Sequence, residues 1–60
     1  MALTKIINGK EYIHDINGTF TEKAGAEAHA YFLKRQYRFI GSTKVEDKGN
    51  GIFWVWWSYK

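Results

Sequence analysis

The sequence predicts an α+β fold in which four strands form one sheet and a single helix packs across one face of it. Three features support this: an Asn-Gly pair at residues 8–9 between two apolar segments, an alanine-rich central segment, and an aromatic run at 51–59. An Asn-Gly pair between apolar segments is typical of a β-hairpin. Because an isolated hairpin is barely stable, we expect two hairpins to share a four-stranded mixed sheet, in the order ββαββ.

The first hairpin is predicted to join strands at residues 3–7 and 10–16. A strict two-residue turn places four side chains on one face of the sheet: Ile7, Tyr12, His14 and Ile16. A bulged turn would place Ile6 there instead of Ile7. We expect the second strand to be a sheet edge, because its hairpin partner occupies one side and the charge of Asp15 discourages pairing with another chain.

The helix is predicted to follow the Asn-Gly break at residues 17–18 and to run to about Tyr37. Thr19 and Glu22 fit a capping box, and Thr21 is a competing cap. At 100° per residue, one helical side gathers Phe20, Ala24, Ala28, Tyr31 and Phe32. We therefore expect Ala24 and Ala28 to face the sheet.

The second hairpin is predicted to consist of strands at 39–46 and 51–59, joined by a loop at 47–51. Alternation in the last strand directs Ile52, Trp54 and Trp56 to one face. It directs Phe53, Val55, Trp57 and Tyr59 to the other. A single helix covers one sheet face only, so we expect at least one tryptophan to keep a large exposed area and to serve as an anchor for a partner.

Composition indicates one soluble globular domain spanning residues 1–60. The chain has 45% apolar residues, a formal charge of +3 and no cysteine. It has no apolar run long enough for a membrane span, and its first residues do not resemble a signal peptide. Around His14 and His29, the two histidines, no residues stand at metal-ligand spacing. We expect no metal, no cofactor and no enzymatic activity, since so small a fold is predicted to leave no concave pocket for a substrate.

Several short motifs resemble those of one known family. They are Asn8-Gly9, Gly18-Thr19-Phe20, Glu22-Lys23-Ala24, Ala26-Glu27-Ala28, Ala30-Tyr31 and Glu46-Asp47-Lys48-Gly49-Asn50. Over residues 4–56 the chain resembles the B domains of protein L, a bacterial surface protein that binds immunoglobulin kappa light chains. The resemblance implies a ubiquitin-like roll (a β-grasp fold), a protein-binding function, and a place at the bacterial cell surface or in a secreted larger protein.

The family binds its light chain through the edge of the second strand and the adjacent helix face, by strand addition. Carried onto this sequence, the implied contacts are Tyr12, Ile13, His14, Asp15, Ile16, Asn17, Glu27 and Tyr31. Three positions depart from the pattern, because Ile16 replaces an aromatic residue, Asn17 a lysine and Leu33 an aspartate. The tryptophans of the last strand are also foreign to the family.

Two other hypotheses come from the aromatic strand. In the first, the chain binds single-stranded nucleic acid: Trp54, Trp56 or Trp57 stacks with bases, and phosphates are contacted by Lys44, Lys48 and Arg38. In the second, the tryptophan face is a homodimer interface, or the repacked core of an altered scaffold. Nucleic-acid binding would weaken steeply with salt, and dimerisation would appear as a concentration-dependent mass.

Overall fold

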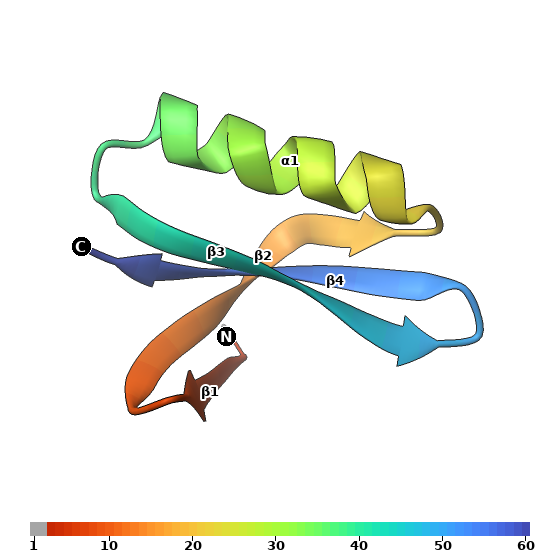
Figure 1. The fold of residues 1–60 in the computed structure, drawn as a ribbon, viewed down its shortest axis with the longest axis horizontal. Helices are drawn as coiled ribbons and strands as arrows, with labels where there is room; N and C mark the ends of the chain where they lie inside the picture. The colour runs from red at the N-terminus through yellow and green to blue at the C-terminus, as the bar shows by residue number, and fades with distance from the viewer. Residues whose placement is uncertain (1–2) are drawn as a thin grey trace.

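The computed structural model describes residues 3–60 and contains four strands and one helix (Figure 1). The elements are β1 (Thr4–Ile7), β2 (Lys10–Phe20), α1 (Lys23–Gln36), β3 (Ile40–Gly49) and β4 (Ile52–Tyr59). The strands form one sheet in the order β1-β2-β4-β3, and α1 packs across one face of it. The predicted α+β class and the ββαββ order are confirmed.

The sheet is antiparallel in every described pair, so the mixed sheet predicted for a ubiquitin-like roll is wrong. The prediction that the second strand is an edge is also wrong, because β2 lies between β1 and β4. The lengths of the strands explain this arrangement: β1 has four residues and β2 has eleven. A long strand in the interior can pair on both sides, whereas a short strand is better suited to an edge.

Both hairpins turn on an Asn-Gly pair with positive φ. Asn8 and Gly9 have φ of 53° and 80°, and Asn50 and Gly51 have φ of 56° and 73°. Positive φ at both central residues is the geometry of the two-residue turn that matches strand twist. Of the two first turns that the sequence left open, the strict two-residue turn is the one present, because Ile7 pairs with Lys10. In the second hairpin β3 extends to Gly49, so the connection is shorter than the predicted loop.

The helix begins later than predicted, at Lys23, and the capping box is wrong. Glu22 occupies the N-cap position and makes no side-chain capping bond. Thr19 and Phe20 belong instead to β2, where they pair with β4. Pairing with large apolar residues of a neighbouring strand outweighs the local preference of Thr19 for a helix start.

The helix presents a different side to the sheet from the one predicted. Ala26, Ala30 and Leu33 are buried, whereas Ala24 and Ala28 are exposed, so their assignment to the core is wrong. Both pairs of alanines have the same helical spacing. The deciding residue is Leu33, which continues the side of Ala26 and Ala30 and packs with Ile40 and Val55.

The three tryptophans divide between the two sheet faces as predicted. Trp57 packs against the core beneath α1, together with Val55. Trp54 and Trp56 lie on the opposite face, where the ring of His14 is 4.2 Å from Trp54 and 5.4 Å from Trp56, centroid to centroid. The last strand therefore contributes to both faces.

The expected large exposure of a tryptophan is wrong. Trp56 is 4% exposed, and Trp54 and Trp57 are partly buried. Two lysines cover the face opposite the helix: the Lys5 ammonium lies 4.6 Å from the centre of the Trp56 ring, and the Lys48 ammonium lies 4.6 Å from that of Trp54. The chain thus covers with its own cations the rings that no helix reaches.

Candidate binding site

A wide bulge in β2 creates the site. His14 pairs with Trp56 and Thr19 with Trp54, so the four residues 15–18 of β2 stand opposite the single residue Val55. Gly18 allows the strand to close again, because a Cβ there would lie 3.0 Å from the Cβ of Asp15 and 3.0 Å from that of Val55. Asp15 keeps the strand alternation that places it, like Ile13, on the face covered by α1, and the extra residues that follow it form the bulge.

Asp15 is held against the helix by His29. The His29 Nε2 atom is hydrogen-bonded to Asp15 Oδ2, and both side chains are mostly buried, at 16% exposure for Asp15 and 20% for His29. The imidazole is itself held between Phe20, at 5.1 Å, and Phe32, at 6.3 Å between ring centroids. These contacts fix the carboxylate at the junction of β2 and α1.

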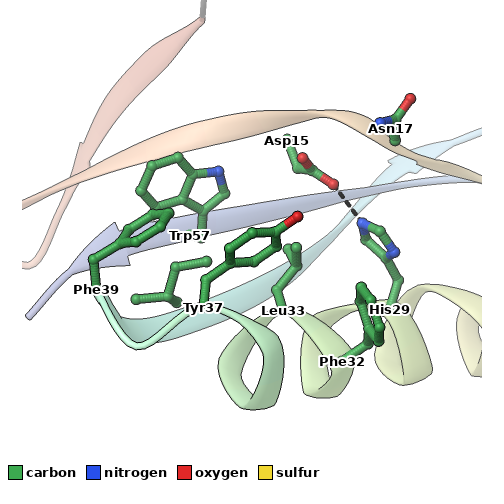
Figure 2. Close-up of a pocket in the computed structure, with 9 residues that line it drawn as sticks. Asp15, Asn17, His29, Phe32, Leu33, Tyr37, Phe39 and Trp57 are labelled. Carbon is green, nitrogen blue, oxygen red and sulfur yellow. Dashed lines mark hydrogen bonds and ion pairs between the residues drawn. The ribbon is translucent and has the colours of Figure 1, made fainter.

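Beside this pair, a hollow of about 240 Å³ opens between α1, β2, β4 and the start of β3 (Figure 2). Its lining consists of Asp15, Asn17, His29, Phe32, Leu33, Tyr37, Phe39, Ile40 and Trp57. The expectation of no concave pocket is therefore wrong. Two residues of the bulge, Asp15 and Asn17, form the β2 side of this hollow.

The wall of the pocket is built from aromatic rings. Phe39 lies 5.5 Å from Tyr37 and 5.6 Å from Trp57, and Trp57 lies 5.0 Å from Tyr59, centroid to centroid. Buried Leu33 and Ile40 form its aliphatic part. Phe39 is 50% exposed and Phe32 51%, so large apolar rings stand open to solvent around the hollow. Contiguous exposed apolar surface of this kind marks an interaction site.

Polar atoms lie on one side of this aromatic pocket. Figure 2 shows the Tyr37 hydroxyl and the Trp57 indole nitrogen pointing toward the side where Asp15 and His29 lie. Among the described residues, none donates a hydrogen bond to the second carboxylate oxygen of Asp15, Oδ1. A few directed polar groups in an apolar hollow are typical of a ligand-binding site.

The structure brings together only part of the predicted site. Asp15, Asn17 and Trp57 line the pocket. Ile13 pairs with Trp57 but does not line the pocket. Ile16 projects from the bulge and is 88% exposed. The predicted contacts therefore do not form one patch.

The two helix residues among the predicted contacts lie outside the pocket. Glu27 and Tyr31 are exposed on α1. The Tyr31 hydroxyl accepts a hydrogen bond of 3.2 Å from Arg35, and the guanidinium carbon lies 5.6 Å from the centre of the tyrosine ring. The Tyr31 ring is thus covered by the guanidinium of Arg35 and is not part of the aromatic wall of the pocket.

Tyr12 and His14 belong to the face opposite the helix, as the register with Lys5 and Trp56 requires. Burial among the aromatic rings lowers the pKa of His14; the charge of Lys48 acts in the same direction, and Asp15 opposes it. The Nε2 atom of His14 is buried without a hydrogen-bond partner in the described part of the chain. Both effects favour the neutral imidazole.

Glu46 connects the charged groups of this opposite face. Its Oε1 atom accepts hydrogen bonds from Lys5 Nζ at 2.9 Å and from Trp56 Nε1 at 2.9 Å, and it lies 3.8 Å from Lys48 Nζ. The hydrogen bond from Lys5 is the main cause that lowers the pKa of this carboxyl group, and the Trp56 bond adds to it. The two lysines are thus held in place over the tryptophans.

Sequence reasoning missed six of the nine pocket residues: His29, Phe32, Leu33, Tyr37, Phe39 and Ile40. One available signal was the Ala26, Ala30 and Leu33 side of the helix, because His29 and Phe32 flank that side. The aromatic residues at 37 and 39, on either side of the helix-to-strand connection, were a second signal. The Asn-Gly pair at residues 17–18 was a third signal, because a glycine inside a strand often marks a bulge.

Comparisons of the chain with protein-family models, curated proteins and solved structures found no match. Within residues 3–60, no helix has the length and apolar character needed to cross a membrane. In the same residues no cluster of three or more His, Cys, Asp or Glu side chains is arranged to hold a metal ion. Conclusions about function therefore depend on the pocket and the surfaces of this chain.

Proposed function

We propose that this chain is a non-enzymatic protein-binding module that takes a side chain of a partner's peptide segment into the pocket between α1 and β2. The observation that carries the proposal is the ring of exposed aromatic side chains around a hollow that contains a fixed carboxylate. Exposed aromatic anchors around a pocket are the usual source of binding energy at protein interfaces.

The size of the pocket favours a side chain over a free small molecule. Its volume of about 240 Å³ lies below the range of roughly 300–1,000 Å³ that is usual for pockets of drug-sized ligands. Exposed Ile16 and Tyr59 extend the apolar surface beyond the lining residues. A peptide segment could place one side chain in the hollow and its neighbours on these flanking residues.

Strand addition to β2 is not the mechanism we propose. Residues Lys10 to Ile13 already pair with β1, and Ile13 and His14 pair with β4. Kappa light chain is a candidate partner, because the turn and helix motifs of this chain resemble those of protein L. If it binds, we expect it to contact the pocket and not the first half of β2.

The test is selection from a random peptide display library with this chain as bait, followed by NMR titration of a selected peptide and of kappa light chain. Shifts should concentrate at Leu33, Phe39 and the Trp57 indole. Phe39→Ser should weaken binding at least about tenfold, since truncated aromatic anchors commonly have effects of this size. Tyr31→Ser, an exposed helix aromatic outside the pocket, serves as the matched control and should bind normally. Shifts confined to the opposite face, or no selected peptide, would overturn the proposal.

A second candidate function is nucleic-acid binding by the face opposite the helix. Register and contacts place four lysines there, Lys5, Lys10, Lys44 and Lys48, with the single acid Glu46. The mechanism differs from the sequence hypothesis, because Trp56 is buried beneath Lys5, Trp57 faces the helix, and Arg38 lies in the connection between α1 and β3. Phosphate contacts would dominate over base stacking.

Salt dependence tests this second candidate. With four phosphate contacts, affinity for oligothymidine should fall about 50-fold between roughly 50 and 200 mM salt. The double variant Lys44→Gln, Lys48→Gln should bind more weakly, while the helix control Lys23→Gln, Lys34→Gln should bind better than that variant. Equal loss in the two variants would indicate that net charge alone, and not this face, attracts the nucleic acid.

A further inference from the structure

We propose that the pocket selects a cationic side chain, arginine or lysine, of the partner segment. The inference rests on the proposed function and names the chemistry of its guest. It combines three observations: the sign of the charge in the pocket, the absence of cations from residues 3–60 over its aromatic rings, and an oxygen of Asp15 to which no described residue donates.

The charge of the pocket lining is opposite in sign to the net charge of the chain. The chain has nine lysines and arginines against six acids. None of the nine lining residues is a lysine or arginine, and Asp15 contributes the one carboxylate among them. An anionic hollow with low-dielectric walls attracts a cation and discourages an anion of the same size.

The aromatic rings of the pocket lack the cations that other rings in this chain possess. Lys5 lies over Trp56, Lys48 over Trp54, and Arg35 over Tyr31. Over residues 3–60, no such contact is made to Phe32, Tyr37, Phe39 or Trp57, although each lines the pocket. A guest ammonium or guanidinium would supply the contact that these rings lack.

The pocket also contains an unused acceptor for the guest's charge. His29 engages Oδ2 of Asp15, and no described residue donates to Oδ1. A guanidinium or ammonium group between this oxygen and the rings of Phe39 and Trp57 would form a charge-assisted hydrogen bond and a cation–π contact together. The planar guanidinium matches flat rings and carboxylate best, so we expect arginine to bind more tightly than lysine.

The test uses three short peptides that differ only at the central residue: arginine, its uncharged isostere citrulline, and leucine. NMR titration of the pocket resonances should give arginine an affinity at least about fivefold higher than citrulline. Asp15→Asn should remove this preference. Glu27→Gln, an exposed helix acid outside the pocket, should keep it and serves as the matched control.

Salt titration of the parent chain adds a measurement that does not depend on folding of the variant. Arginine binding should weaken with salt, whereas leucine binding should change little. If leucine binds as tightly as arginine and shifts the same pocket resonances, the cationic assignment is overturned and the proposed function stands. If none of the three peptides shifts the pocket and display selection also fails, the proposed function is overturned with it.

Discussion

The two faces of the sheet use aromatic side chains of the same strand in opposite ways. On the face opposite α1, Lys5 and Lys48 cover Trp56 and Trp54, and Glu46 holds the lysines in place. On the helix face, Trp57 opens into a pocket with a carboxylate and no lysine or arginine. An aromatic strand is therefore not by itself evidence of a binding face. The two faces differ in whether the chain itself places a cation over each aromatic ring.

The side of α1 that faces the sheet determines where the pocket lies. Ala30 is 6% exposed in the core, whereas Ala28 is exposed. Ala30→Asp would bury an unpaired charge and should abolish the cooperative thermal transition, a loss of at least about 3 kcal/mol. Ala28→Asp is the matched control and should change stability by less than about 1 kcal/mol. The measurement is thermal unfolding followed by circular dichroism. If Ala28→Asp were the more destabilising variant, α1 would face the sheet with another side, and the pocket between α1 and β2 would be contradicted.

The bulge that forms the pocket depends on Gly18. Gly18→Ala places a Cβ 3.0 Å from both Asp15 and Val55, so we expect a loss of about 1–3 kcal/mol in the free energy of unfolding. Gly25→Ala, inside α1, is a control for which we expect a change in stability of the opposite sign. The new Cβ would make an ordinary 3.4 Å contact with the side chain of Phe20 in β2. Alanine should stabilise that position by up to about 1 kcal/mol. Denaturant unfolding measures both, and a neutral Gly18→Ala would contradict the tight closure of the bulge.

The opposite face should respond to pH through His14. Its lowered pKa means that the folded state binds the proton more weakly than the unfolded chain. The free energy of unfolding should therefore be fully retained above pH 6.5 and decrease as the pH falls through 6.5 toward the lowered pKa. In His14→Phe, which keeps an aromatic ring between the tryptophans, this decrease should disappear. An unchanged pH profile in the variant would assign the effect to another group.

The smallest effect is expected at Glu46. Glu46→Gln keeps an acceptor for Trp56 but removes the charge that holds Lys5, and a partly exposed pair of this kind contributes less than about 1 kcal/mol. Since the pKa of Glu46 is lowered, the parent should lose stability as the pH falls below 4.5, and the variant should lose less. Glu27→Gln, on the exposed helix surface, is the matched control for the change in net charge.

The sequence predicts this fold well where local geometry is decisive. The Asn8-Gly9 turn, the alternation of Trp54, Trp56 and Trp57, and the order of elements all follow from local backbone preferences. Strand order does not follow from local preferences, because it depends on how much surface β2 can bury between two neighbouring strands. The pocket was beyond prediction because the bulge at 15–18 is a property of β2 pairing with β4, and the residues that line the pocket meet only once that pairing forms.

One measurement tests the contrast between the faces most directly: relaxation of the tryptophan indole N–H signals by a cationic and by an anionic nitroxide, in the unmodified protein. Trp57, beside Asp15, should broaden more with the cationic probe. Trp54, beneath Lys48, should broaden more with the anionic probe, and buried Trp56 should respond weakly to both. Preferential broadening of Trp57 by the anionic probe would contradict an anionic pocket, and with it the account of how the two faces differ.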